Sequence, residues 1–141
     1  MKAHFVDIDL NTNKHLQFID ITDKIKEAVK KSNVKNGFCL AYSNHTTASV
    51  KITENESSLL DDFEALFKSI APEDSKYGHN LTNVDSRKNA HSHLRSLLLQ
   101  QSEIMPVKDS KLLLGEWQSI FFIEFDGPRN NRKIMVEVFG E

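Results

Sequence analysis

The stretch QSIFFIEF, residues 118–125, decides the fold class of this chain. Five of its eight residues are bulky and apolar, and they do not alternate with polar ones. A nearly continuous apolar run of this length is typical of a strand that is covered on both faces. The sequence therefore predicts a buried strand over residues 118–126, with protein packed against each of its two faces.

Strand patterns also surround this run. We predict strands at 103–108, 111–114 and 132–139, with turns at Asp109-Ser110 and Asp126-Gly127-Pro128.

The first half of the chain holds further strands. Residues 3–10 and 15–21 alternate between apolar and polar side chains around the turn cluster Asn11-Thr12-Asn13, which predicts a β-hairpin. Two more strands are expected at 38–43 and 48–53.

Three helices are expected between the strands. Thr22-Asp23 is a helix N-terminal signal in front of KIKEAVKKS. The second helix follows Asn55, carries apolar residues at helical spacing and ends at Pro72. The third runs over about 89–100, and its expected buried stripe is Ala90, Leu94, Leu97 and Leu98.

The resulting order, ββαββα–loop–αββββ, predicts a single α+β domain over residues 1–141. Strict βαβ alternation and a Gly-rich phosphate loop are both missing, which disfavours a Rossmann or P-loop fold. The connection over residues 72–88 is polar and irregular. Connections of that length are uncommon in small domains and are often functional.

Composition restricts the classes of function. A net charge of −2 argues against a nucleic-acid-binding surface. No apolar run has the length of a membrane span, and the opening MKAHFVDIDL lacks the apolar core of a signal peptide. The single cysteine, Cys39, is expected to be a small buried residue rather than a nucleophile. We therefore expect a cytoplasmic protein that needs no disulfide.

Histidines are the main candidates for chemistry. Three of the six, His45, His79 and one on the third helix, could converge on a metal site, because a catalytic zinc typically takes three protein ligands. The alternative is a set of unrelated loop and surface histidines. His91 and His93 are separated by about 200° on a regular helix, so both cannot face one pocket. We choose His93, beside the expected apolar stripe, and expect His91 nearer solvent.

Other polar residues have two interpretations each. Glu54 is either a general base beside the histidines or, like Glu56, a favourable charge at a helix N-terminus. Trp117 and Gln118 either belong to the strand start or line a ligand pocket. Arg129 is either a surface residue or a fork for phosphate or carboxylate.

Taken together, several segments resemble the YjbQ-like family. In order they are HTTASV (45–50) with Thr53-Glu54-Asn55, Tyr77-Gly78-His79, NAHSHL (89–94), Met105-Pro106-Val107, LGEWQSI (114–120) and EFDGPR (124–129). Their order and spacing match the family through about residue 129.

The resemblance implies a compact β-sandwich with outer helices, assembled as a homotrimer. It also implies a pocket around His45, Glu54, His79 and His93. Members of the family have been linked to a thiamine-phosphate synthase activity. One departure is Glu116, where the family usually has threonine. Strand alternation points Glu116 away from the pocket if Trp117 faces inward.

The leading hypothesis is a metal-assisted enzyme in which His45, His79 and His93 hold a divalent metal. In thiamine-phosphate synthesis, a cation and Arg129 or Lys88 would stabilise the leaving pyrophosphate of a phosphorylated small molecule. Three histidines favour zinc over magnesium, which prefers oxygen ligands. The rivals are a metal-dependent hydrolase with Glu54 as base, and a non-catalytic metabolite- or metal-binding trimer.

Overall fold

The computed structural model describes residues 1–82 and 86–141, so part of the predicted 72–88 connection lies outside the described residues. Within them the chain is α+β, as predicted, with eight strands in two sheets and three α-helices. The elements are β1 (Lys2–Thr12), β2 (Gln17–Asp20), α1 (Thr22–Ser32), β3 (Gly37–Ser43), β4 (Ala48–Thr53), α2 (Ser57–Ile70), the 3₁₀ helix η1 (Gly78–Leu81), α3 (Ala90–Leu97), β5 (Ser102–Lys108), β6 (Lys111–Leu112), β7 (Ser119–Glu124) and β8 (Arg129–Gly140).

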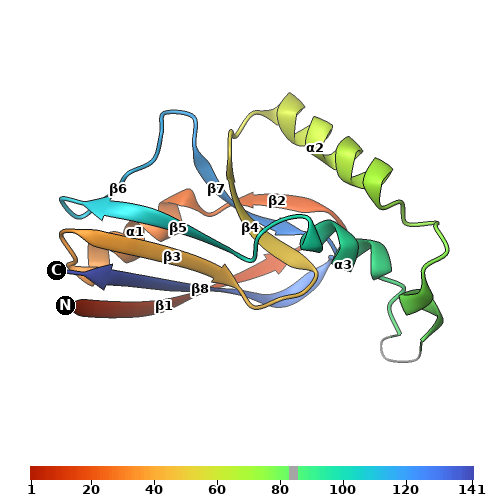
Figure 1. The fold of residues 1–141 in the computed structure, drawn as a ribbon, viewed down its shortest axis with the longest axis horizontal. Helices are drawn as coiled ribbons and strands as arrows, with labels where there is room; N and C mark the ends of the chain where they lie inside the picture. The colour runs from red at the N-terminus through yellow and green to blue at the C-terminus, as the bar shows by residue number, and fades with distance from the viewer. Residues whose placement is uncertain (83–85) are drawn as a thin grey trace.

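The two sheets pack face to face. One has the strand order β1-β8-β3-β5-β6 and the other β2-β7-β4. Residues of both sheets form the main core, including Cys39 and Val136 from the larger sheet and Phe122 from β7. Both termini lie at one end of the sandwich, and the β3–β4 connection and α3 lie at the other (Figure 1).

Strand β7 is covered on both faces, which confirms the prediction from its sequence. Ile120 and Phe122 belong to the main core. Phe121 and Ile123 point the other way, into a second cluster with Phe67 of α2. Alternate residues of a strand point to opposite faces, so an apolar run serves both clusters.

The predicted β-hairpin at the start of the chain is wrong, although both of its strands form. β1 pairs with β8 in the larger sheet, whereas β2 pairs with β7 in the smaller one. The segment between them changes sheet and buries Leu16 in the second cluster. Each strand thus finds its partner about a hundred residues away instead of next door.

Helix α3 packs with the opposite face to the predicted one. Its buried residues are His91, Ser92, Arg95 and Ser96 together with Ala90, while Leu94, Leu97 and Leu98 are exposed. The Ser92 hydroxyl donates to the Phe125 carbonyl, and the Ser96 hydroxyl donates to the Ala48 carbonyl at 3.0 Å. These bonds satisfy the polar groups at the sheet and hold the serine face inward.

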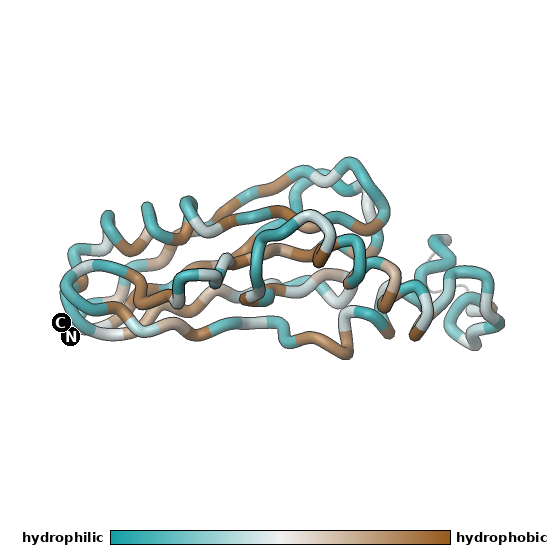
Figure 2. The backbone as a smooth tube through the Cα atoms, turned by 90° about the horizontal axis from the view of Figure 1, so that it is seen from above, coloured by the Kyte–Doolittle hydropathy of each residue, from teal (hydrophilic) through white to brown (hydrophobic). Residues whose placement is uncertain are grey.

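Hydropathy follows this architecture. Hydrophobic segments run along the strands, and the segment that follows α2 is mostly hydrophilic (Figure 2). No helix in the described ranges is both long and apolar enough to cross a membrane.

Candidate functional site

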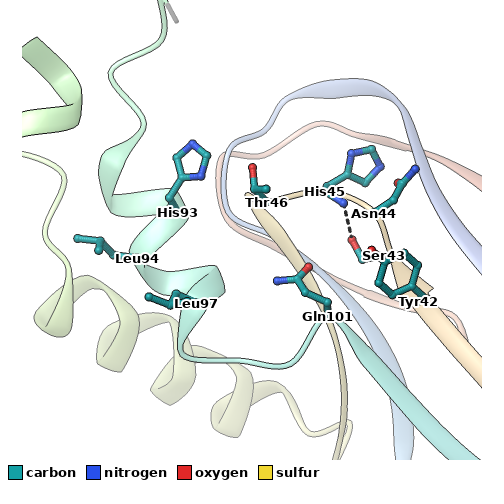
Figure 3. Close-up of a pocket in the computed structure, with 9 residues that line it drawn as sticks. All are labelled: Tyr42, Ser43, Asn44, His45, Thr46, His93, Leu94, Leu97 and Gln101. Atoms are coloured by element: carbon teal, nitrogen blue, oxygen red, sulfur yellow. Dashed lines mark hydrogen bonds between the residues drawn. The ribbon is translucent and has the colours of Figure 1, made fainter. Parts of the chain in front are cut away.

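A cleft of about 370 Å³ lies between the β3–β4 connection and α3 (Figure 3). Its lining combines polar groups of the connection with the outer side of α3. The lining residues are Tyr42, Ser43, Asn44, His45, Thr46, His93, Leu94, Leu97 and Gln101. In Figure 3 His93 extends from α3 on the side facing Thr46 and His45. The structure therefore brings His45 and His93 to one cleft, as the sequence predicts.

A more polar hollow of about 250 Å³ adjoins the cleft and shares His45 and His93 with it. Its other lining residues are Asn44, Thr46, Thr47, Asn89, Arg129 and Arg132. Of the two interpretations of Arg129, a place beside the histidines is the one compatible with this lining. We call the cleft and this hollow together the His45–His93 pocket.

The His45 ring is held by a backbone bond. Its Nε2 accepts a hydrogen bond from the Lys133 N–H at 2.9 Å. Burial and then the nearby Arg132 lower the pKa of His45, which favours the neutral ring. A neutral imidazole that accepts at Nε2 carries its proton on Nδ1. His45 therefore presents an N–H donor rather than a second lone pair.

His79 and His93 lie against each other. Their ring centroids are 4.9 Å apart in an edge-to-face arrangement. His79 Nε2 is 3.3 Å from the Asn89 side-chain oxygen, and the Asn89 amide nitrogen donates to Asp126 at 2.9 Å. The η1 segment and the start of α3 are thereby connected to the wall of the pocket.

The two guanidinium groups that line the hollow pair with buried carboxylates. Arg132 donates to Glu124 at 2.7 Å and to the Thr47 hydroxyl at 2.8 Å. Arg87 and Arg129 both donate to Asp126.

Asp126 is held in its ionised form. Burial raises the pKa of its carboxyl, but the hydrogen bonds from Asn89 and Arg129 outweigh it, so the pKa lies below the ordinary value. Asp126 therefore keeps Arg129 in place at neutral pH.

Three other predicted site residues lie elsewhere in the chain. Glu54 is exposed beyond the end of β4, whereas His45 precedes its start, and the six residues of β4 alone span about 20 Å. Thr53 pairs with Ser119, so Trp117 and Gln118 lie at that same far end. The Trp117 side chain is 68% exposed, and the Gln118 side chain accepts from the Gly115 N–H at 2.7 Å. A single chain does not bring these residues to the His45–His93 pocket.

His91 is buried, so its expected place near solvent is wrong. It is 4% exposed, and burial, Arg95 and His15 lower its pKa. The angular argument nevertheless holds, because His91 and His93 face different clusters. His91 Nε2 lies 2.7 Å from His15 Nε2. Within residues 1–82 and 86–141, one group of His, Cys, Asp or Glu side chains has three such ligand atoms within 4.8 Å, namely His15, Glu73 and His91.

Sequence reasoning missed this second cluster. His15 lies in the link between β1 and β2, Glu73 follows α2 and His91 lies on α3. Their spacings of 58 and 18 residues, from positions 15, 73 and 91, form no local motif. Only the packing of α3 against that link brings them together.

Comparison with known proteins gives one consistent answer. A family model described as UPF0047 protein YjbQ-like matches residues 6–141. A UPF0047 protein of Methanothermobacter thermautotrophicus is 42% identical over 141 residues, which cover 100% of this chain and 95% of that protein. The crystal structure of a YbjQ-like protein of unknown function from Sulfolobus solfataricus has a TM-score of 0.94 at 38% identity, covering 99% of each chain. The crystal structure of a hypothetical protein from Aeropyrum pernix has a TM-score of 0.87 at 33% identity, covering 100% of each chain.

Proposed function

The chain belongs to the UPF0047 YjbQ-like family, and we propose that its His45–His93 pocket binds a phosphorylated small molecule and transfers protons on it. The observation that carries this proposal is the donor-rich lining of the pocket. Arg129 and the Nδ1–H of His45 offer hydrogen-bond donors, and Arg132 adds a second guanidinium group to the lining. Such a lining favours anions, because guanidinium groups match the geometry of phosphate oxygens.

The proposed chemistry is general acid–base catalysis with phosphate or pyrophosphate as the leaving group. Arg129 stabilises the charge that develops on the leaving oxygen. His93, which is half-buried beside His79, exchanges the proton. Thiamine-phosphate synthesis, in which pyrophosphate leaves a carbon atom, belongs to this class. In phosphoester hydrolysis water attacks phosphorus and the alcohol leaves, so Arg129 would stabilise the phosphoryl oxygens and His93 would protonate the leaving alcohol oxygen. The volume of the cleft, about 370 Å³, is in the range of sites for small molecules.

A metal on His45, His79 and His93 fits this geometry poorly. His45 uses its Nε2 lone pair for the Lys133 N–H, and its Nδ1 carries the proton. Metal binding through either nitrogen requires that this backbone bond breaks, because a metal ligand must present a lone pair. We therefore assign hydrogen-bonding and proton-transfer roles to these histidines. A divalent cation can still reach the pocket on the phosphates of a substrate, the usual mode for Mg²⁺.

The test is steady-state turnover on a panel of phosphoesters and on the two thiamine-phosphate precursors, with and without chelator. We expect His93→Gln to lower kcat roughly a hundredfold to ten-thousandfold. We expect Arg129→Gln to raise KM at least tenfold, about the loss of one charged hydrogen bond. His4→Gln, on β1, is the matched control and should keep parental rates. Equal rates in all four proteins would contradict the proposal, and phosphate binding without turnover would leave a non-catalytic binder.

We also propose that the chain forms a homotrimer, as the family resemblance implies. The support is the outer face of the larger sheet, which exposes Phe5, Phe38, Tyr42, Ile104 and Met135. The pairings Tyr42–Met135 and Leu40–Ile104 place these side chains on one face of adjacent strands. These exposed apolar residues surround Glu137, which lies between Phe5 and Leu40 on the same face. A group of exposed apolar side chains on one sheet face favours an interaction surface. Tyr42 also lines the pocket, so the proposed interface would border the site.

Light scattering at micromolar concentration tests the assembly. The parent should have three times the chain mass of 16.1 kDa. Ile104→Glu, which places a charge on the apolar face, should shift the mass towards monomer. Leu81→Glu is the control, because Leu81 is an exposed apolar residue on η1, away from the larger sheet. A parental monomer would contradict the proposal.

A further inference from the structure

We propose that His15, Glu73 and His91 form a binding site for a divalent transition metal, separate from the His45–His93 pocket, with Zn²⁺ as the best fit. The proposal does not depend on the proposed function. It rests on the position of three ligand atoms, on the support of one ring by a backbone carbonyl and on the access from solvent.

The separations of the ligand atoms suit a tetrahedral metal. His15 Nε2 lies 2.7 Å from His91 Nε2 and 3.8 Å from Glu73 Oε1. Ligands at about 2.0–2.1 Å from zinc in tetrahedral geometry are roughly 3.3 Å apart. The two observed distances lie on either side of that value. The ligand atoms of His91 and Glu73 lie within 4.8 Å of each other. Movement of the exposed Glu73 side chain by up to about 1.5 Å therefore places all three atoms around one ion.

His15 has the support that metal-binding histidines usually have. Its Nδ1 lies 3.2 Å from the Gly127 carbonyl oxygen and donates its proton there. This bond fixes the tautomer and leaves the Nε2 lone pair directed at the cluster. Metal-ligating histidines typically donate their other ring N–H to a carbonyl or carboxylate in this way. No change of tautomer is needed for His15 to bind the ion.

The site is anchored on one side and open on the other. His91 is buried on α3, which fixes its position, whereas the His15 and Glu73 side chains are 37% and 53% exposed. A metal can thus enter from solvent beside Glu73. Three protein ligands also leave a fourth position for water or a substrate atom, as in catalytic zinc sites. Two histidines and one carboxylate suit zinc better than magnesium or calcium.

Arg95 sets the strength of the site. Its side chain is fully buried, with Nη1 3.7 Å from Glu73 Oε1. Neither Nη1 nor Nη2 has a hydrogen-bond partner within the described part of the chain. The guanidinium attracts Glu73 towards the cluster and also repels a cation. A carboxylate has two oxygens, so Glu73 can contact the metal through one and Arg95 through the other.

The experiment titrates chelator-treated full-length protein with Zn²⁺ by calorimetry and measures zinc content per chain after dialysis. We expect one zinc per chain. His15→Ala and Glu73→Gln should each weaken binding at least tenfold, since each removes one of three ligands. Both positions are partly exposed, and circular dichroism checks that the variants fold. Zinc should raise the melting temperature of the parent but not that of Glu73→Gln.

His79→Ala and His93→Ala are the matched controls, because they belong to the other histidine cluster. They should bind zinc as the parent does. Loss of zinc in His93→Ala with retention in His15→Ala would place the metal in the His45–His93 pocket and overturn the proposal. Absence of zinc binding in the parent would also overturn it, leaving the His15–His91 contact as a plain hydrogen bond.

Discussion

The backbone N–H of Lys133 on β8 donates a hydrogen bond of 2.9 Å to Nε2 of His45 in the β3–β4 connection. This bond fixes which nitrogen of His45 carries the proton. It also ties the β3–β4 segment to β8, the longest strand of the larger sheet. The donor group that the pocket offers is therefore set by main-chain geometry 88 residues away.

The first prediction concerns the protonation of His45. Its pKa in the folded protein should lie below its ordinary value of 6.5, and its neutral form should carry the proton on Nδ1. Protonation would replace the Nε2 lone pair and oppose the Lys133 N–H. ¹⁵N-detected NMR titration of the ring nitrogens measures both properties. A pKa at or above 6.5, or a proton on Nε2, would show that the assignment is wrong.

The lowered pKa of His45 also makes the stability of the folded protein depend on pH. Because the folded pKa is lowered, the unfolded chain binds more protons between the two pKa values. The contribution of His45 is fully present above pH 6.5 and decreases as the pH falls from there towards the folded pKa. Chemical denaturation of the parent and of His45→Gln from pH 8 to pH 5 should show a smaller loss in the variant.

The second prediction concerns the buried pair Glu124–Arg132. Glu124 is fully buried and accepts from Arg132, from the Thr12 hydroxyl and from the Asp126 N–H. Glu124→Gln leaves the Arg132 charge buried without its carboxylate, which should reduce the free energy of unfolding by about 3–5 kcal/mol. Urea denaturation of the parent and the variant measures this loss.

The matched control is Glu64→Gln, which removes the solvent-accessible partner of Lys68 on α2. Surface pairs of this kind contribute less than about 1 kcal/mol. Similar losses for the two variants would contradict the structural role of the buried pair.

The third prediction concerns Gly37, where β3 starts beside β8. A Cβ at this position would lie 2.0 Å from the Phe139 carbonyl oxygen, so alanine forces the two strands apart. Gly37→Ala should reduce the free energy of unfolding by about 3 kcal/mol, the upper range for overpacking. Gly78→Ala, with open space around its Cβ position, should have little effect. Thermal unfolding measures the stability of both variants. Equal stabilities would contradict the close approach of β3 and β8 at Gly37.

The fourth prediction separates Glu54 from Glu56. Glu56 caps α2 by accepting from the Ser58 and Leu59 N–H groups at 2.9 and 2.8 Å, and these bonds lower its pKa. Glu56→Ala should lower the melting temperature by a few degrees through the lost cap. Glu54→Ala, without such bonds to the helix, should leave it nearly unchanged. The reverse order would make Glu54 the cap.

Local sequence patterns were sufficient to predict an element where its burial shows in its own residues. The apolar run at Ile120–Phe122 predicts a strand with both faces covered, and the apolar spacing of α1 predicts a helix with one buried face. The convergence of His45 with His93 was one of two alternatives from the residues and was implied by the family resemblance, and the helix angle separated His91 from His93. These inferences need no knowledge of distant partners, because strand and helix periodicity is a property of each segment.

Only the tertiary structure decided which segments meet. The sheet partners of β1 and β2 depend on β8 and β7, about a hundred residues away, so adjacency in sequence misled. Helix α3 buries Ser92 and Ser96 because carbonyl groups of Phe125 and Ala48 satisfy their hydroxyls. A polar face can be the inner face whenever distant groups complete its hydrogen bonds, and sequence periodicity does not record those groups. The same packing buries His91 and places it against His15. The spacing of these residues in the sequence does not predict this cluster.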